Sequence, residues 1–237
     1  MKINIKGPII SDSDQWIYDW CGIPATSPSL VSKLMDKAEK NEELEIIINS
    51  GGGSVDSGTE IYSALKDYDG NVIGKIVGLA ASAASVIAMG CTKLLMSPPA
   101  RIMIHNSAIR TQGDHSDLEH TAGVLKTVDI GIANAYELKT GMSHAELLAL
   151  MEDETWFDAK KALDNKLIDE IMFTETKIVN SAQTLSDGTL PQAVIDKIRN
   201  ELKGKKGIVN SEEIPPEPTE PKVNNELVLA KLKLKLK

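Results

Sequence analysis

One pattern occurs twice in the first hundred residues: an apolar run, a glycine-containing turn and a helical stretch. The first run, residues 45–49, ends in Ser-Gly-Gly-Gly at 50–53, and the second, residues 72–77, ends at Gly78. Short apolar runs of this kind are typical of buried parallel strands. Strand, turn and helix in this order predict βαβ units and an α/β layered fold. In such folds ligands bind at the carboxyl ends of the strands, where both turns are expected.

The second turn opens the stretch GLAASAASVIAMG, residues 78–90. We expect Gly78 to supply an unusual backbone angle and a buried helix to run from Ala80 to Met89, closed by Gly90. Ser82 would then lie among amide groups that have no helical partner, which suits a nucleophile and its oxyanion. The alternative is structural: small residues let this helix pack closely and the serines only cap it.

Composition excludes several classes of protein. The chain has 237 residues, 42% of them hydrophobic, which is enough for one sizeable core and a tail. A net charge of −8 argues against nucleic-acid binding, and 4% aromatic residues leave few stacking platforms. We expect the two cysteines, Cys21 and Cys91, to be reduced core residues. Without a signal-like start or a run of about 20 apolar residues, we expect a soluble cytoplasmic protein that does not enter a membrane.

The other elements follow from periodicity, caps and breakers. Residues 11–26, with Trp16 and Trp20, are expected to form a loop, and a long helix is expected over 116–139. Ser143 and Glu146 have the spacing of a capping box. The remaining expected strands are 2–6, 92–96, 100–104 and an extended piece at 153–157, and the remaining expected helices begin at 27–29, 54 and 159.

Ser82, His105 and an acid at 153–154 form a candidate triad, because each ends a strand or begins a loop. Serine needs a base to take its proton, imidazole suits that role near neutral pH, and an acid orients the imidazole. The alternative is that His105 is an ordinary core histidine. The other histidines, at 115, 120 and 144, lie in charged stretches without metal-ligand spacing, so no metal site is expected.

The glycine turn at 50–53 opens a helix, so its amides could face an anion. No Gly-Lys-Ser/Thr follows it, as a Walker loop requires, and it has no GxGxxG spacing. An oxyanion donor or a cradle for a substrate strand therefore fits better than a phosphate site.

Four segments follow one another along the chain: INSGGG at 48–53 with Gly58, GLAAS at 78–82, RIMIH at 101–105, and WFDA at 156–159 continuing to Leu167-Ile168-Asp169. In order and spacing they resemble motifs of the Clp protease proteolytic subunit (ClpP) family. The resemblance spans roughly residues 3–173, and the triple glycine, the Glu-Thr-Trp segment and the charged tail are most similar to its phage and prophage head-maturation branch.

The resemblance implies a role for each matching residue. Ser82 would be the nucleophile and His105 the general base. The backbone amides of Gly53 and Ala83 match the oxyanion donors, and Gly52 belongs to the same substrate-binding loop. The reaction implied is hydrolysis of a peptide bond through an acyl-enzyme, without metal or cofactor.

The chain also departs from the family pattern. The triad aspartate of the family aligns with Glu154; glutamate can fill this role, and Asp153 remains the alternative. Ser85 falls on a non-catalytic position. Lys166 replaces a family glycine, so Asn165 is expected to take the left-handed cap. Gly51 and Ser107 replace prolines of the family, which puts the rigidity of their loops in question.

The resemblance further implies a ClpP/crotonase-type α/β fold of stacked ββα units, in which the helix at 116–139 protrudes for ring-to-ring contact. We divide the chain into a peptidase domain at 1–175, a helical extension at 176–207, and a Pro-rich acidic linker with a basic Leu/Lys tail at 208–237. The tail is either an arm that binds a partner or a disordered, solubilising end.

The expected protein is therefore a serine endopeptidase that forms a homo-oligomeric ring and cleaves a protein substrate, such as a phage capsid precursor. Because Ile3 is already in the first expected strand, we expect no counterpart of the family segment that precedes this strand and meets the unfoldase ring, and we therefore do not expect a Clp-type ATPase partner. Two rival functions are a crotonase-like acyl-CoA enzyme and a non-enzymatic assembly or scaffold protein with a relic site.

Overall fold

The computed structural model describes residues 1–174; the expectations for 176–207 and 208–237 lie outside these residues. Its centre is a seven-stranded sheet in which β1–β4 and β7 follow one another in that order. All pairings are parallel except that of β5 with β6, so the predicted α/β class with buried parallel strands is confirmed. The strands are β1 (Lys2–Lys6), β2 (Leu44–Ser50), β3 (Val72–Ala81), β4 (Lys93–Met96), β5 (Arg101–Ile104), β6 (Thr155–Phe157) and β7 (Glu170–Ile171).

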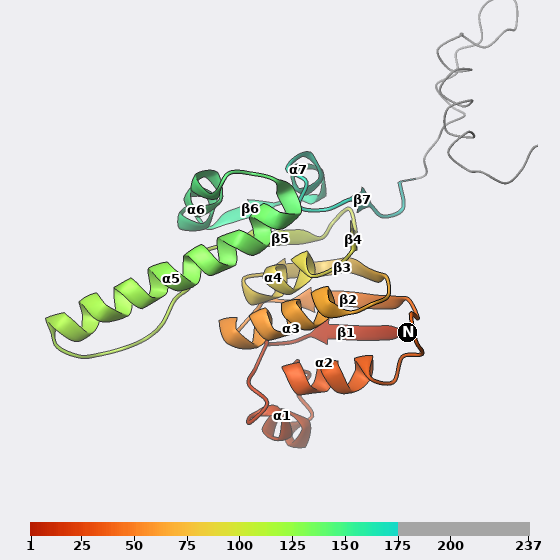
Figure 1. Ribbon diagram of the computed structural model, residues 1–237, viewed down its shortest axis with the longest axis horizontal. Helices are drawn as coiled ribbons and strands as arrows, with labels where there is room; N and C mark the ends of the chain where they lie inside the picture. Colours follow the sequence, from red (N-terminus) through yellow and green to blue (C-terminus); the bar gives the residue numbers. More distant parts are fainter. Residues whose placement is uncertain (175–237) are drawn as a thin grey trace, which may run out of the picture. The chain divides into compact units, whose positions relative to one another are not determined.

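Helices α2, α3 and α4 lie next to one another along the sheet, and α5 extends well beyond it (Figure 1). Local signals account for their ends: Pro28 is at the first turn of α2, and the expected capping box of Ser143 and Glu146 begins α6. The helices are α1 (Gln15–Cys21), α2 (Pro28–Met35), α3 (Val55–Asp67), α4 (Ala83–Met89), α5 (His115–Thr140), α6 (His144–Glu152) and α7 (Ala159–Asp164).

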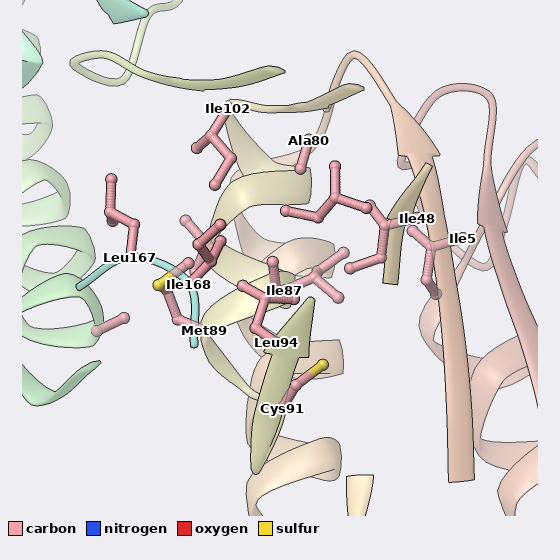
Figure 2. Packing of buried hydrophobic residues seen from close by; sticks show 14 of the residues in the cluster. Ile5, Ile48, Ala80, Ile87, Met89, Cys91, Leu94, Ile102, Leu167 and Ile168 are labelled. Carbon is pink, nitrogen blue, oxygen red and sulfur yellow. The ribbon is translucent and has the colours of Figure 1, made fainter. Parts of the chain in front are cut away.

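The core lies between the sheet and α4. Ile5, Ile48 and Leu94 of the sheet are fully buried and belong to the same hydrophobic cluster as Ile87 of α4 (Figure 2). Burying a side chain of this size stabilises the fold by roughly 1.5–3 kcal/mol. Because α4 is buried along its whole length, the turn that precedes it is held on a rigid support.

Two predictions for the segment 11–26 are wrong. Residues 15–21 form helix α1 instead of a loop, and Trp16 and Trp20 on it are 67% and 82% exposed. Cys21 at its end is exposed as well, whereas Cys91 is buried as expected. The helix is only seven residues long and contains no buried residue, so no apolar stripe marks it in the sequence.

The end of α7 also differs from the prediction. Asn165 has a φ of −91°, and the left-handed residue is Lys166, with a φ of 58°. The Leu167 amide donates to the Ala162 carbonyl at 2.9 Å, which closes the helix one residue later than expected. The left-handed residue is thus at the position where the family has glycine. Here that residue is Lys166, whose backbone is strained by the positive φ.

Candidate active site

Strand β3 is long enough to pair with two neighbours in succession. Residues 73–76 pair with β4, and Leu79 to Ala81 pair with Arg101 to Met103 of β5. The two strands are parallel and end at the same edge of the sheet, so they bring Ser82 and His105 together. This edge is the one predicted from the glycine turns.

Ser82 lies in the turn between β3 and α4, not inside a helix as predicted. The strand continues to Ala81 and the helix begins at Ala83, which leaves Ser82 with φ 54° and ψ −129°. This conformation is rare for a residue with a side chain and costs on the order of 1–3 kcal/mol. The unusual angle that we expected of Gly78 is therefore found at Ser82, and Gly78 continues the strand.

The Ser82 hydroxyl and the His105 ring are within hydrogen-bond distance, with 2.7 Å between Oγ and Nε2. Both residues are half-buried. An imidazole nitrogen at this distance can accept the hydroxyl proton while the oxygen attacks an electrophile. The pair can therefore carry out nucleophilic chemistry.

The glycine loop lies directly against Ser82. A Cβ on Gly52, which has a φ of 90°, would be 2.7 Å from Ser82 Cβ and 2.6 Å from the Ala81 carbonyl oxygen, so only glycine fits there. The Gly52 amide is occupied, because it donates to Ser50 Oγ at 3.1 Å. Within residues 1–174, the amides of Gly53 and Ala83 have no hydrogen-bond partner. Both amides are therefore free to donate a hydrogen bond.

Asn49 holds the loop and β3 together, a role that the sequence analysis did not assign. Its Oδ1 accepts a hydrogen bond from the Leu79 amide at 3.1 Å, at the irregularity between Ile48 and Ser50 in the β2–β3 pairing. A Cβ on Gly78 would be 2.5 Å from this oxygen, so Gly78 makes room for the asparagine side chain. The signal in the sequence is the Asn within the INSGGG segment.

The two candidate acids, Asp153 and Glu154, are both exposed and follow α6. Glu154 has a φ of 47°, and its Oε1 accepts a hydrogen bond from Trp156 Nε1 at 3.2 Å. The Met151 carbonyl accepts from the amides of both Asn106 and Glu154, which ties the two loops together. Among the described residues, neither carboxylate is hydrogen-bonded to His105.

Two polar residues of α5 contact the site and were not found from the sequence. The Asp129 carboxylate accepts a hydrogen bond from the Ser107 amide at 2.6 Å, two residues after His105. The Tyr136 hydroxyl is 2.7 Å from Ser85 Oγ. The signal for both was helical spacing, since 129 and 136 are seven residues apart on the face that also buries Ile132.

Other groups expected to be solvated are exposed or half-buried, namely His115, His120 and His144. In the part of the chain that the structure describes, no three metal-ligating side chains cluster. None of the helices described is both long enough and apolar enough to cross a bilayer.

The fold and this edge of the sheet define an α/β protein with a serine and a histidine paired at the end of parallel strands. The model of the Clp protease family matches residues 25–175, and the chain belongs to this family. It is similar to the ATP-dependent Clp protease proteolytic subunit 1 of Protochlamydia amoebophila, with 28% identity over 62% of this chain and 74% of the relative. The subunit of the same name from Chlamydia abortus is 32% identical over 59% and 75% of the two chains.

A proteolytic subunit from Bacteroides fragilis is 30% identical over 62% of this chain and 73% of the relative. Family and relatives agree with the ClpP-type fold inferred from the four sequence segments and support a protease. They do not distinguish a phage branch from the other branches of the family.

Proposed function

We propose that this protein is a serine endopeptidase in which Ser82 is the nucleophile and His105 the general base. The single observation that carries the proposal is the 2.7 Å distance between Ser82 Oγ and His105 Nε2 at a strained turn. The amides of Gly53 and Ala83 would bind the oxyanion. Glu154, with Asp153 as the alternative, would orient the imidazole and stabilise its protonated form.

In the proposed reaction, Ser82 Oγ attacks the scissile carbonyl carbon while His105 Nε2 takes the hydroxyl proton. The carbonyl oxygen becomes an oxyanion, which the two free amides stabilise. The proton then passes from His105 to the leaving amine as the C–N bond breaks, leaving an acyl-enzyme. Water hydrolyses the ester with His105 again as the base. No metal or cofactor enters these steps.

Labelling with a fluorophosphonate probe and mass spectrometry tests the assignment. We expect one adduct, on Ser82, and no adduct in Ser82→Ala, whose peptidase rate should fall by roughly 10⁶. Ser63→Ala is the matched control, because Ser63 is an exposed serine of α3 whose hydroxyl donates to the Thr59 carbonyl of the same helix. A wild-type protein that is not labelled but binds coenzyme A would instead favour the crotonase-like function. A wild-type protein that is neither labelled nor binds coenzyme A would favour a scaffold.

We further propose that the protein works as a homo-oligomeric ring. Helix α5 carries Leu118, Val124 and Ile130 with 47%, 47% and 49% of their surfaces exposed, so residues 1–174 of one chain leave them uncovered. Sedimentation at micromolar concentration should give a mass several times the 25.7 kDa of one chain. Leu118→Asp together with Val124→Asp should lower that mass. A wild-type monomer would contradict the ring.

Finally, we propose a head-maturation protease whose substrate is a phage capsid precursor. This proposal rests on the triple glycine, the Glu-Thr-Trp segment and the charged tail. Co-expression with a phage capsid precursor should give cleavage that Ser82→Ala abolishes. Deleting residues 222–237 tests whether the tail tethers the substrate, since a tether raises local substrate concentration. Equal cleavage by the full-length and the truncated protein would contradict the role of the tail as a tether, but not the protease function.

A further inference from the structure

Behind Ser82 lies a buried chain of hydrogen bonds that none of the proposed catalytic steps uses. Ser85 Oγ donates to the Ser82 carbonyl oxygen at 2.6 Å, and Tyr136 Oη is 2.7 Å from the same Ser85 oxygen. Ser85 is fully buried and Tyr136 is 1% exposed, so water does not substitute for either partner. The three groups come from the turn, from α4 and from α5.

The number of hydroxyl protons fixes which group donates in each of these hydrogen bonds. A serine hydroxyl has one proton, and that of Ser85 is used in the bond to the Ser82 carbonyl. The Tyr136 hydroxyl must therefore be the donor to Ser85 Oγ. Burial raises the pKa of Tyr136, which keeps the phenol protonated and able to donate throughout the physiological range.

The Ser82 carbonyl, the last acceptor in this series of hydrogen bonds, belongs to the peptide unit that joins Ser82 to Ala83. Because a peptide unit is planar, fixing the direction of its C=O also fixes the direction of its N–H. That N–H is the Ala83 amide, which has no hydrogen-bond partner within residues 1–174. The amides of Ser85 and Val86 also donate to the Ser82 carbonyl, at 2.8 and 3.3 Å, but they belong to the helix itself. Among the hydrogen bonds of the described residues, those of the Ser85 and Tyr136 side chains connect this peptide to α5.

We propose that Ser85 and Tyr136 are positioning residues, which hold the Ser82–Ala83 peptide so that the Ser82 hydroxyl faces His105 and the Ala83 amide faces the oxyanion. The inference rests on the proposed peptidase function for its catalytic consequence. Neither residue touches the reacting atoms. Tyr136 acts only through Ser85, and it makes the geometry of the strained turn depend on the packing of α5 against α4.

Tyr136→Phe is the sharpest test, because it removes one oxygen and leaves the ring in place. We expect kcat to fall by about tenfold with KM nearly unchanged, a smaller loss than the 10²–10³ of deleting an oxyanion donor outright. Ser85→Ala removes both side-chain bonds and should lower kcat further. The double variant should be no slower than Ser85→Ala, because among the described residues the Tyr136 hydroxyl reaches the turn only through its hydrogen bond with Ser85.

Thr140→Val is the matched control. Thr140 is a buried hydroxyl on the same helix; it donates to the Tyr136 carbonyl at 2.8 Å and has no bond to Ser85. The control should lower the melting temperature about as much as Tyr136→Phe and leave kcat unchanged. A loss of kcat in Thr140→Val equal to that in Tyr136→Phe would show a general effect of weakening α5 and would overturn the proposal.

Hydrogen exchange followed by mass spectrometry gives a readout that does not need activity. In Tyr136→Phe, exchange should rise in peptides that contain the amides of residues 83–86, whereas Thr140→Val should leave them as in the wild type. Unchanged exchange together with a wild-type kcat would overturn the inference. A wild-type protein without peptidase activity whose exchange still rises in Tyr136→Phe would overturn the proposed function and leave the positioning of the turn intact.

Discussion

Ile104 on β5 pairs with Thr155 on β6, and this antiparallel register, continued by one residue, sets His105 opposite Glu154. The shared Met151 carbonyl, which accepts from Asn106 and from Glu154, holds the two loops at that point. Asp153 is one step farther from the pairing and serves as the C-cap of α6. The register therefore favours Glu154 over Asp153 as the acid of the proposed triad.

The first prediction is that Glu154→Gln lowers kcat by roughly 10⁴, as the corresponding change of a triad acid does. A glutamine keeps the shape but cannot stabilise the protonated imidazole. Asp153→Asn is the control and should change kcat by less than about tenfold. Steady-state hydrolysis of a fluorogenic peptide measures both rates, and the opposite ranking would move the role to Asp153.

The second prediction concerns the glycine loop. Gly52→Ala should lower the free energy of unfolding by about 1–3 kcal/mol and greatly reduce labelling of Ser82, because the new Cβ would collide with Ser82 Cβ and Ala81 O at a positive φ. Gly51→Ala is the matched control, since a Cβ there meets nothing within 4 Å. Denaturant unfolding and the rate of fluorophosphonate labelling measure the two effects. Equal behaviour of the two variants would contradict the close approach.

The third prediction concerns Asp129. The family has a proline at position 107, and Ser107 instead has an amide that donates to the buried Asp129 carboxylate at 2.6 Å. This bond supplies rigidity that the missing proline would otherwise give to the segment after His105. Asp129→Ala should lower the free energy of unfolding by about 1–3 kcal/mol, because it leaves a donor without its partner.

The same change should slow turnover, because the segment that carries His105 would move more freely. Asp164→Ala is the control: Asp164 pairs with Lys160 at 3.6 Å on an exposed face of α7, so its loss should cost under about 0.5 kcal/mol. Chemical unfolding and kcat are measured for both variants. An Asp129→Ala protein as stable and as active as the wild type would refute the proposed rigidity.

The fourth prediction is a dependence of stability on pH. Lys75 Nζ donates to Glu45 Oε2 at 2.8 Å, and this hydrogen bond, more than the charges of Lys75 and Lys2, lowers the pKa of Glu45 below its ordinary 4.5. A lowered folded-state pKa stabilises the fold above the unfolded-state pKa, and the contribution is lost as the pH falls through the folded-state value. The difference in unfolding free energy between wild type and Glu45→Gln should thus be constant from pH 7 to pH 6 and shrink below pH 4.5.

Lys75→Met should remove most of the same pH-dependent contribution, because Lys75 makes the shorter contact with Glu45 and the contact with Lys2 at 3.6 Å remains. Urea unfolding at a series of pH values between 7 and 3 measures it for the three proteins. A wild-type advantage over Glu45→Gln that persists unchanged at pH 3 would contradict the assignment.

Much of the architecture was accessible from the sequence because its signals are local. Apolar runs of four to seven residues identified β2, β4 and β5, and the cap at Ser143 located the start of α6. The glycine turns pointed to the edge of the sheet where Ser82 and His105 meet, since strand ends and helix starts depend on neighbouring residues. Helix α1 escaped detection because it buries no residue and so has no apolar stripe.

Only the tertiary structure decided the conformation of the site. Local propensity places Ser82 in a helix, but pairing of Leu79 to Ala81 with β5 extends the strand and leaves the serine at a positive φ. The hydrogen bond between Ser85 and Tyr136 joins residues 51 positions apart, and that between Ser107 and Asp129 joins residues 22 apart. Such contacts depend on how α5 packs, which periodicity does not specify. The sequence therefore determined which residues reach this edge of the sheet, whereas long-range hydrogen bonds and packing determined how they are held.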